Sequence, residues 1–528
     1  MIEKHILSFL LILSISIIYK SFEININEGF IIRSAIPIKN KTWENYNGRI
    51  HISPKAIFEP STLEDLIDIV NLARINNETI RCAAQGHTVS SLSVTESYLV
   101  VVNKLNKVTV QKHFKYGWTV TAEAGTSFYD LDNALRFHDP PLTLDSEPIY
   151  DSFRVSGVVA TGAHGAKTSS GITSDQVCSM KIVTGSGELH EFSEEINSLE
   201  FNAAKVNLGL LGIIYSVTFR TQPMYNLRLT NNYVPVTWLN NPLRMKNLVN
   251  SSDGFQIYYF PYNGFKSSDD PNFYDFNKDQ IVVRTWKRTN EPVSFTQQQL
   301  DQLHNTQRQN ILRLYGLISS ELPTNPRAAS TIAASILTSN SSSDVYQAPD
   351  AIHSIAHQPN ALYDLSSYTF KVDPDFSNVA TEAYHAIQTL YEFAGQGRYP
   401  LNYLMEFRIL KSDEALLSPT FNHDPDVLYC SLDFMPVIGT PYYEEFVSLL
   451  AQRFFDKYKA KPHWAKNWEF VPNVTSYLSV VYSDQIKLFE KVREKYDPDN
   501  IFFDNKSLEE IFNGALSQRN DKNSRKNN

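Results

Sequence analysis

The chain has 528 residues, of which 42% are hydrophobic and 20% are charged, and its formal net charge at pH 7 is −9. This composition is typical of a globular protein, and the length exceeds what one hydrophobic core serves, so we expect two or three domains. The negative charge argues against nucleic acid or an anionic membrane surface as the main partner, because both attract basic surfaces.

The first 22 residues have the pattern of a secretory leader. Lys4 and His5 precede an apolar run over 6–19, which is shorter than the roughly 20 residues that cross a bilayer. No small-residue cleavage motif follows, so an uncleaved anchor is the alternative, and we expect a membrane partner only in that case. Glycosylation sequons favour the secretory pathway, with an extracellular location or one in the lumen or membrane of the endoplasmic reticulum. The sequons start at Asn40, Asn77, Asn250, Asn340, Asn473 and Asn505.

Residues 53–225 alternate short strands and helices. A capping box at 61–64 predicts the start of a helix with apolar residues at helical spacing. The turn Gly125-Thr126-Ser127 leads into a second helix that carries Phe128, Leu131 and Leu135. Strands are predicted at 98–102, 108–110, 118–122, 180–184 and 213–219.

From 226 to 459 the predicted strands are longer and alternate more regularly, which favours a second, sheet-based domain. The polar segment 339–344 is the best loop candidate. Residues 514–528 are polar and charged, and we expect this tail to be disordered. In the second domain the pattern predicts strands at 255–260 and 280–286, and helices at 296–314, 378–393 and 442–457.

The three cysteines, Cys82, Cys178 and Cys430, are too few for a disulfide framework and permit one bridge at most. No cysteine pair has the spacing of a zinc site or of a redox motif. The sequence therefore predicts no metal site.

Three segments are rich in small residues. In 81–88, which follows an extended run, exposed backbone N–H groups can approach a ligand, and His87 is placed to touch it. In 155–166, three glycines allow a flat ligand to lie against the backbone, although no G-x-G-x-x-G fingerprint occurs. In 207–214, small residues lead into a strand. Alternatively, His87 is an ordinary turn residue, His164 is a structural turn residue, and 207–214 is a glycine-bearing entry into a strand.

Two further segments carry charges. Read as a strand, 403–409 places Glu406 and Arg408 on one face, about 7 Å apart. They form either a structural ion pair or a site for a polyhydroxylated substrate, in which the cation stabilises negative charge. In 461–468, Lys466 lies among Trp and His residues, where it either steadies an anionic ring or covers aromatic packing.

These segments, in this order, resemble the flavin-dependent sugar-lactone oxidases of the vanillyl-alcohol-oxidase superfamily, in the arabinono-lactone, gulono-lactone and alditol oxidase branch. The resemblance covers about 43–512. In the flavin loop, Ala84 replaces a glycine and Thr88 replaces a serine. The matching motifs are Arg81–Thr88, Thr161–Gly165, Leu208–Gly212, Glu406 with Arg408, His463–Lys466 and Asp497–Phe502.

The resemblance implies a two-domain α+β fold. A PCMH-type FAD-binding domain would span 53–225, completed by 460–513, and a substrate domain would span 226–459. It implies FAD bonded covalently through His87. Catalytic roles fall to Glu406, Arg408 and Lys466, and which of them accepts the hydroxyl proton stays open. The implied cofactor-binding residues are Arg81, Ala84, Gln85, Gly86, His87, Thr88, Ser156, Gly157, Thr161, Gly162, His164, Gly165, Gly212, Ile213 and His463.

The implied reaction is oxidation of a sugar-1,4-lactone of the D-arabinono or L-gulono/galactono type by hydride transfer to FAD, which dioxygen reoxidises to give hydrogen peroxide. A position linked to oxygen use in the family aligns near Pro148, which leaves oxidase and dehydrogenase open; a secreted enzyme lacks cytochrome partners, which favours the oxidase. One alternative is an alditol or oligosaccharide oxidase with the same flavin apparatus. The other is a non-catalytic secreted flavin-fold binding protein, suggested by Ala84 and by the unmatched segment 290–350.

Overall fold

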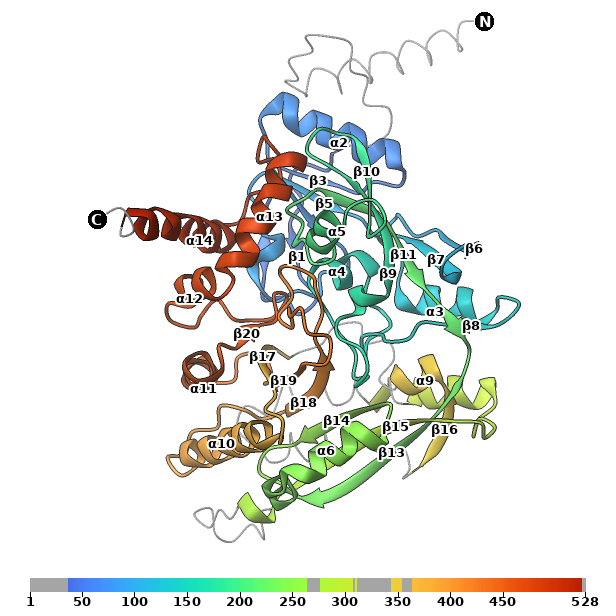
Figure 1. Ribbon diagram of the computed structural model, residues 1–528, viewed down its shortest axis with the longest axis vertical. Helices are drawn as coiled ribbons and strands as arrows, with labels where there is room; N and C mark the ends of the chain where they lie inside the picture. Colours follow the sequence, from blue (N-terminus) through green and yellow to red (C-terminus); the bar gives the residue numbers. More distant parts are fainter. Residues whose placement is uncertain (1–36, 264–275, 307–308, 311–342, 354–362, 525–528) are drawn as a thin grey trace, which may run out of the picture.

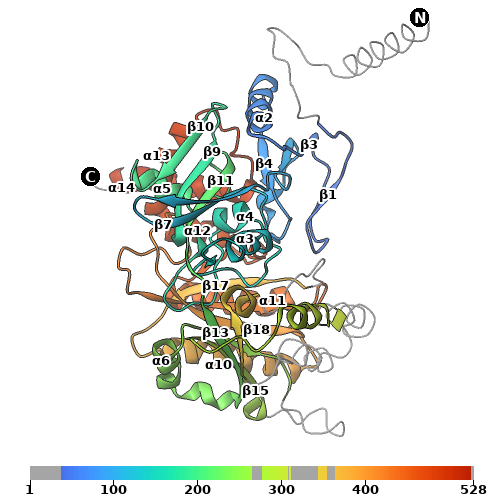
Figure 2. The ribbon, with the colours of Figure 1, turned by 90° about the vertical axis from the view of Figure 1, so that its right-hand side faces the viewer.

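The computed structural model describes residues 37–263, 276–306, 309–310, 343–353 and 363–524. They form two lobes, which lie one above the other in both Figure 1 and Figure 2. The upper lobe combines the amino-terminal part of the chain with the last helices, and the lower lobe holds the middle part. Helices and sheets occur in both lobes, so the predicted two-domain α+β fold class is confirmed.

Two sheets frame the upper lobe. The parallel sheet has the order β3 (Ala56–Phe58), β5 (Tyr98–Val101) and β4 (Ile80–Ala83). The antiparallel sheet has the order β10 (Leu189–Ser193), β9 (Val177–Val183), β11 (Ile213–Arg220), β7 (Gly117–Glu123) and β6 (Val108–His113). Short pairs join β1 (Trp43–Glu44) to β2 (His51–Ile52), and β8 (Leu142–Thr143) to β12 (Gln222–Pro223). Each strand predicted between 98 and 219 is present, with ends that differ by a few residues.

The first long helix starts one residue later than predicted. Its N-cap is Thr62, whose hydroxyl accepts from the backbone N–H of Asp65, while the Asp65 carboxylate accepts from the N–H of Thr62. The predicted box began at Ser61 and ended at Glu64, and was therefore wrong by one position. Helix α3 follows the N-cap Ser127, as predicted. The helices of this part are α2 (Leu63–Asn76), α3 (Phe128–Arg136), α4 (Val155–Ala160) and α5 (Ser198–Ala204).

One eight-stranded antiparallel sheet forms the lower lobe. Its order is β16 (Asp344–Gln347), β13 (Asn226–Pro235), β15 (Gln280–Thr289), β14 (Gly254–Tyr259), β18 (Leu404–Lys411), β19 (Leu428–Met435), β17 (Ser366–Lys371) and β20 (Lys461–Pro462). Its helices are α6 (Pro242–Ser251), α9 (Ala348–Ile352), α10 (Ser377–Ala394) and α11 (Tyr443–Tyr458). Helix α10 contacts both α6 and α11, which pack on β14 and β17, so these helices cover the sheet on one side (Figure 1).

After β20 the chain returns to the upper lobe through α12 (Val474–Val481), α13 (Ser483–Tyr496) and α14 (Lys506–Ser524), drawn in red in Figure 1. The prediction of a disordered tail over 514–528 is wrong for its first part, because α14 continues to Ser524. Leu508, Ile511, Phe512 and Ala515 recur at helical spacing and are buried. Their packing keeps this end of the chain helical.

One lower-lobe prediction is changed. Asp344, which was assigned to the loop 339–344, is the first residue of β16 and pairs with Leu229. The helix predicted at 296–314 is confirmed over 297–306 and 309–310, while residues 307–308 and 311–314 lie outside the described part. Backbone pairing to β13 thus overrides the polar composition near Asp344.

The predicted leader, 1–22, lies outside the described residues and stays a prediction. No helix in the described part of the chain is both long and apolar enough to cross a membrane. Cys82, Cys178 and Cys430 are all free thiols, so none of the disulfides that their number permitted is formed.

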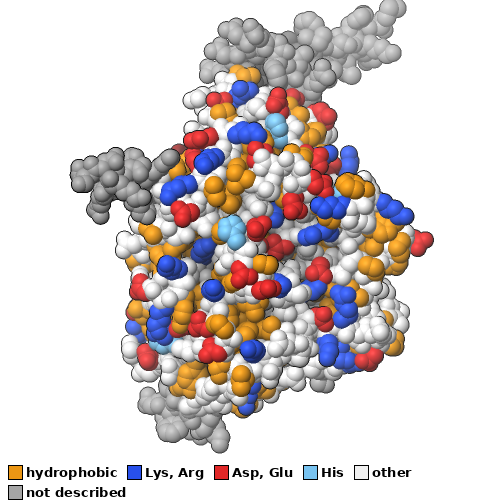
Figure 3. Space-filling view, viewed as in Figure 1, with side chains coloured by type: hydrophobic (Ala, Val, Ile, Leu, Met, Phe, Trp, Pro, Cys, Tyr) orange, Lys and Arg blue, Asp and Glu red, His pale blue; other side chains and the backbone are white. Residues whose placement is uncertain are grey.

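Charges of both signs share the surface. On the face in Figure 3, Lys and Arg side chains are interspersed with Asp and Glu over both lobes. An example is Lys495 of α13, whose Nζ lies 2.7 Å from Oε1 of Glu200 in α5. Exposed pairs of this kind contribute about 0–1 kcal/mol each, so stability rests on the buried interactions.

Arg81 of β4 connects three separate parts of the upper lobe. Its buried guanidinium donates to the carbonyls of Leu92, Leu208 and Phe502, at distances between 2.8 and 2.9 Å. Burial lowers the pKa of Arg81 from its ordinary value, but an arginine stays protonated and its donors must be satisfied. The three carbonyls satisfy them, and the loop after β4 is thereby fixed to its neighbours.

We predict that Arg81→Ala lowers the free energy of unfolding by about 3–5 kcal/mol, because three buried carbonyls lose a charged donor. Urea denaturation followed by circular dichroism measures this change. Arg74→Ala is the control, since Arg74 is 43% exposed and its Nε lies 3.8 Å from Asp499. A loss below about 1 kcal/mol for Arg81→Ala would contradict the assignment.

Candidate active site

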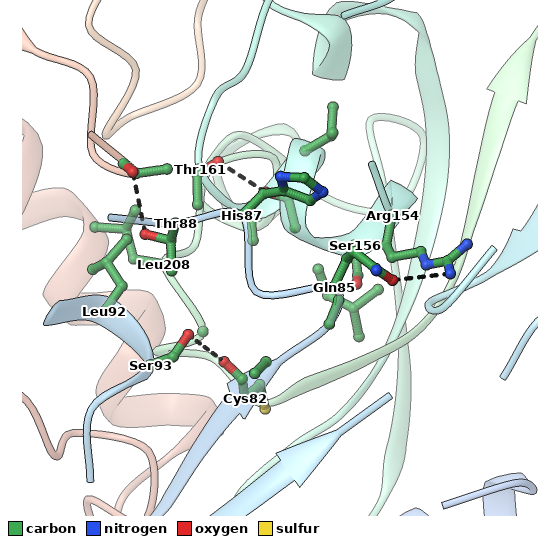
Figure 4. Close-up of a pocket in the computed structure, with 18 of the residues that line it drawn as sticks. Cys82, Gln85, His87, Thr88, Leu92, Ser93, Arg154, Ser156, Thr161 and Leu208 are labelled. Carbon is green, nitrogen blue, oxygen red and sulfur yellow. Dashed lines mark hydrogen bonds between the residues drawn. The ribbon is translucent and has the colours of Figure 1, made fainter. Parts of the chain in front are cut away.

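A long cleft lies between the loop after β4, helix α4, the turn at Leu208 and the segment 463–466. It encloses about 1060 Å³ of space, open mouth included. In the close-up of Figure 4, Cys82 and Ser93 lie at one end and the His87 ring lies towards the other. Gln85 accepts a hydrogen bond from Arg154 at 3.0 Å beside that ring. Segments that are far apart in the sequence thus form one elongated site.

His87 is held between two aromatic rings in this cleft. Its ring centroid lies 4.6 Å from those of both Tyr46 and Phe153. Burial, and then the positive charges of Lys466 and Arg154, lower the pKa of His87 to about 3. The imidazole is therefore neutral at neutral pH, and one of its nitrogens keeps a lone pair that can act as a nucleophile.

A second cavity lies on the sheet of the lower lobe. Across four neighbouring strands, Tyr258 is paired with Glu406, Glu406 with Asp433, and Asp433 with Ser367. All four residues line this cavity. Because residues in register project from the same face of a sheet, the strand pairing produces this polar row.

The row continues along β18 to Arg408, whose Nε lies 2.7 Å from Glu406 Oε1 and whose Nη2 lies 3.3 Å from Asp433 Oδ2. All three side chains are more than 90% buried. The Glu406 contact is a buried ion pair, and its two atoms, Glu406 Oε1 and Arg408 Nε, are covered by the surrounding residues. Two carboxylates and one guanidinium are thus fixed in the cavity wall.

Lys466, His463 and His164 lie where the cleft approaches the cavity. Burial lowers the pKa of Lys466 to about 8, against the opposing effect of the Asp433 carboxylate. Burial also lowers the pKa of His164 to about 4 and that of His463 well below its ordinary value. The histidines are therefore neutral, and the protonated lysine and Arg408 balance the charges of Glu406 and Asp433.

The cleft and the cavity meet, because Phe153, Ala163, His463 and Lys466 line both. A ligand in the cleft and a ligand in the cavity would therefore touch at this point. It is the place where the two could exchange atoms or electrons.

The structure brings most of the predicted site residues together. Glu406, Arg408 and His164 line the cavity rather than the cleft. Gly162 and Gly165 line neither, and a Cβ on Gly165 would lie 2.4 Å from the Glu147 carbonyl oxygen, so Gly165 permits close backbone packing. Those in the cleft are Arg81, Ala84, Gln85, Gly86, His87, Thr88, Ser156, Gly157, Thr161, Gly212, Ile213, His463 and Lys466.

Several lining residues were not predicted from the sequence. Asp433, the second carboxylate at Arg408, is the most important of them, and only its strand register with Glu406 identifies it. Phe153 and Arg154 approach His87 from the start of α4. The cavity also has four unpredicted tyrosines in its wall, Tyr150, Tyr258, Tyr363 and Tyr403.

Comparison with known families agrees with this geometry. Residues 54–193 match the FAD binding domain family, which makes the cleft lobe a flavin-binding unit. Residues 217–510 match the family described as D-arabinono-1,4-lactone oxidase. The chain belongs to the D-arabinono-1,4-lactone oxidase family of FAD-dependent oxidoreductases, which confirms the resemblance found in the motifs.

Individual relatives are distant. The chain is 30% identical to D-arabinono-1,4-lactone oxidase of Saccharomyces cerevisiae over 234 residues, which is 43% of each chain. The match to the Candida glabrata enzyme of that name likewise spans only 42% of its length. The chain is 24% identical to L-gulonolactone oxidase of Scyliorhinus torazame over 89% of this chain and 98% of that one.

Among solved structures, cholesterol oxidase from Brevibacterium sterolicum has a TM-score of 0.76 at 19% identity, over 93% of this chain and 99% of that one. Xylooligosaccharide oxidase from Myceliophthora thermophila has a TM-score of 0.62 at 14% identity, over 87% and 92%. These likenesses show a shared fold.

The cleft fits FAD. Gly157 lines it, and a Cβ on this residue would meet nothing within 4 Å, so a ligand can lie against the bare backbone there. Gly86 has a φ of +77°, and a Cβ on it would lie 3.1 Å from the Trp43 ring, so the turn that presents His87 favours glycine. Arg81 supports the loop rather than the ligand, since its donors are bonded to carbonyls.

We predict that the Lys466 ammonium titrates near pH 8, and that Asp433→Asn moves this pKa lower, because a carboxylate that favours the charged amine is lost. The ¹³C shift of the Lys466 ε carbon in the full chain measures it, with Lys466→Arg used for assignment.

Asp426→Asn is the matched control, since the Asp426 side chain is 90% exposed. An unchanged titration in Asp433→Asn would show that this carboxylate does not act on the amine.

Proposed function

We propose that the protein oxidises the carbinol carbon of a sugar-1,4-lactone of the D-arabinono or L-gulono/galactono type, and that dioxygen is the final acceptor. The alcohol would lose a hydride and a proton and become a carbonyl, while dioxygen would gain both and become hydrogen peroxide. What FAD supplies, when bound, is the two-electron acceptor between them. Membership of the D-arabinono-1,4-lactone oxidase family supports this substrate class.

The observation that carries the proposal is the polar row of Glu406, Arg408 and Asp433 in a cavity that meets the flavin cleft. Carboxylates can accept from substrate hydroxyls, and a guanidinium can donate to a substrate oxygen. A polyhydroxylated lactone offers both donors and acceptors to such a row.

The remaining groups have distinct roles in the proposal. Asp433 also contacts the Arg408 guanidinium, with 3.3 Å between Nη2 and Oδ2. Lys466 lies at the junction of cleft and cavity and, in its neutral form, takes the carbinol proton; its pKa of about 8 is close to the working pH that favours such a base. Four tyrosines in the cavity wall, two of which stack (Tyr363 and Tyr403), would limit the access of water to this step.

We also propose that His87 carries FAD covalently. The support is its neutral, ring-clamped imidazole in a cleft that fits the cofactor. A covalent bond at this position would hold the flavin next to the shared residues Phe153 and Lys466.

His87→Ala is expected to release FAD into the supernatant on acid precipitation, whereas the wild-type pellet stays yellow. His113→Ala, which changes a histidine of the same lobe on strand β6, is the control. Flavin that pellets with the His87→Ala protein would place the bond at another residue.

The function itself is tested by mixing the purified protein with lactones, alditols and oligosaccharides without oxygen. We expect lactones to bleach the flavin absorbance and air to restore it with formation of hydrogen peroxide. Arg408→Ala should reduce turnover by roughly 100-fold or more, because a buried donor to the substrate is lost. Arg228→Ala, an arginine on β13 that pairs with Glu291, serves as the control.

The same panel separates the alternatives. Bleaching by polyols but not by lactones would assign the alditol oxidase function. A colourless protein that takes up no FAD would assign the non-catalytic binding protein. Bleaching without recovery in air would assign a dehydrogenase.

A further inference from the structure

A second buried polar cluster lies between the lobes, apart from the residues used above. It consists of Asp132 on α3, Glu147 in the loop after β8, and His353 directly after α9. His353 Nε2 lies 2.8 Å from Glu147 Oε2 and 3.1 Å from Asp132 Oδ2. The exposed fractions are 5%, 1% and 5%, so water screens none of these groups.

A backbone carbonyl determines which nitrogen of His353 carries the hydrogen and which one has a lone pair that faces the carboxylates. His353 Nδ1 lies 3.0 Å from the carbonyl oxygen of Ile149. A carbonyl only accepts, so Nδ1 carries the hydrogen and donates it. In a neutral ring, Nε2 then presents a lone pair to two carboxylates. Three acceptor atoms within 4.8 Å of one another require a proton or a cation between them.

The cluster also has unsatisfied oxygens. Asp132 Oδ1 and Glu147 Oε1 are buried and have no hydrogen-bond partner among the residues that the structure describes. The neighbouring Arg136 is committed to Asp350, with 2.6 Å between Nη2 and Oδ1. The cluster thus needs one positive charge, which either a proton on His353 Nε2 or a bound cation can supply.

We propose that Asp132, Glu147 and His353 bind one divalent transition-metal ion, of the zinc or manganese type. Ligand atoms about 2.0–2.2 Å from a tetrahedral metal lie about 3.4 Å from each other. The two carboxylate oxygens lie 2.8 and 3.1 Å from His353 Nε2, so an ion fits among them after the side chains move apart by a few tenths of an ångström. One imidazole with two carboxylates suits these metals better than calcium or magnesium, which prefer oxygen alone. The Ile149 carbonyl fixes the ring as an outer partner of a metal-bound histidine commonly does.

The metal would join the two lobes. Asp132 and Glu147 belong to the upper lobe and His353 to the lower one, and 206 positions separate His353 from Glu147. Glu147 also lines a small separate cavity with Lys167 and Ile352. Since Pro148 and Tyr150 follow Glu147 and line the substrate cavity, the metal would fix one wall of that cavity.

The test is the metal content of the full chain, purified without a histidine tag and measured by elemental mass spectrometry. After dialysis against chelator and addition of zinc or manganese chloride, we expect about one equivalent to remain bound per chain after desalting. Asp132→Asn and His353→Gln should lower the bound metal about tenfold or more. The melting temperature of the wild type should fall when the metal is removed, and that of the variants should not respond.

His423→Gln is the control, because His423 lies 3.6 Å from Glu414 but its side chain is 82% exposed. If the wild-type protein retains no metal, the proposal is overturned, and the three groups instead share a proton. Equal metal content in wild type and in both variants would overturn it too. The readout needs neither flavin nor turnover, so it is independent of the proposed oxidase function.

Discussion

The buried guanidinium of Arg81 holds the upper lobe in its functional shape. It donates to carbonyls of three segments, at Leu92, Leu208 and Phe502, that the chain brings together from distant positions. The loop with His87 begins a few residues after it, so the position of the imidazole depends on this anchor. Arg81 belongs to the flavin-loop motif, but its donors hold backbone carbonyls in place and do not contact a ligand.

The lower lobe contributes charged side chains to the candidate active site. Its central strands bury Glu406, Arg408 and Asp433 in one polar row. Burying charges is costly unless they are paired, and here two carboxylates face one guanidinium, with Lys466 nearby as the second cation. This balanced row of charges lines the cavity, which suits a site that binds a polar ligand.

The two lobes are interdependent at their interface. Phe153, Ala163, His463 and Lys466 line both the cleft and the cavity. The cluster of Asp132, Glu147 and His353 crosses the same interface at another point. One continuous core of buried apolar side chains also extends through both lobes. Interactions across the interface therefore set how the cavity faces the cleft.

The sequence by itself determined many of the local elements and the motifs. Apolar periodicity and small-residue loops depend on neighbouring residues, so they predicted five strands of the upper lobe between 98 and 219, the helix that follows Ser127, and the pair of Glu406 and Arg408 on one strand face. The helical tail beyond residue 514 was missed, because burial of Ala515 against other helices outweighs a polar composition.

Only the tertiary structure decided the partners of these residues. Asp433 reaches Arg408 through strand register, and His353 meets Asp132 and Glu147 through the packing of two lobes. The role of Arg81 depended on carbonyls far away in the sequence. Such contacts arise from chain topology, which no local pattern encodes, and they set the charge, burial and protonation that give the site its chemistry.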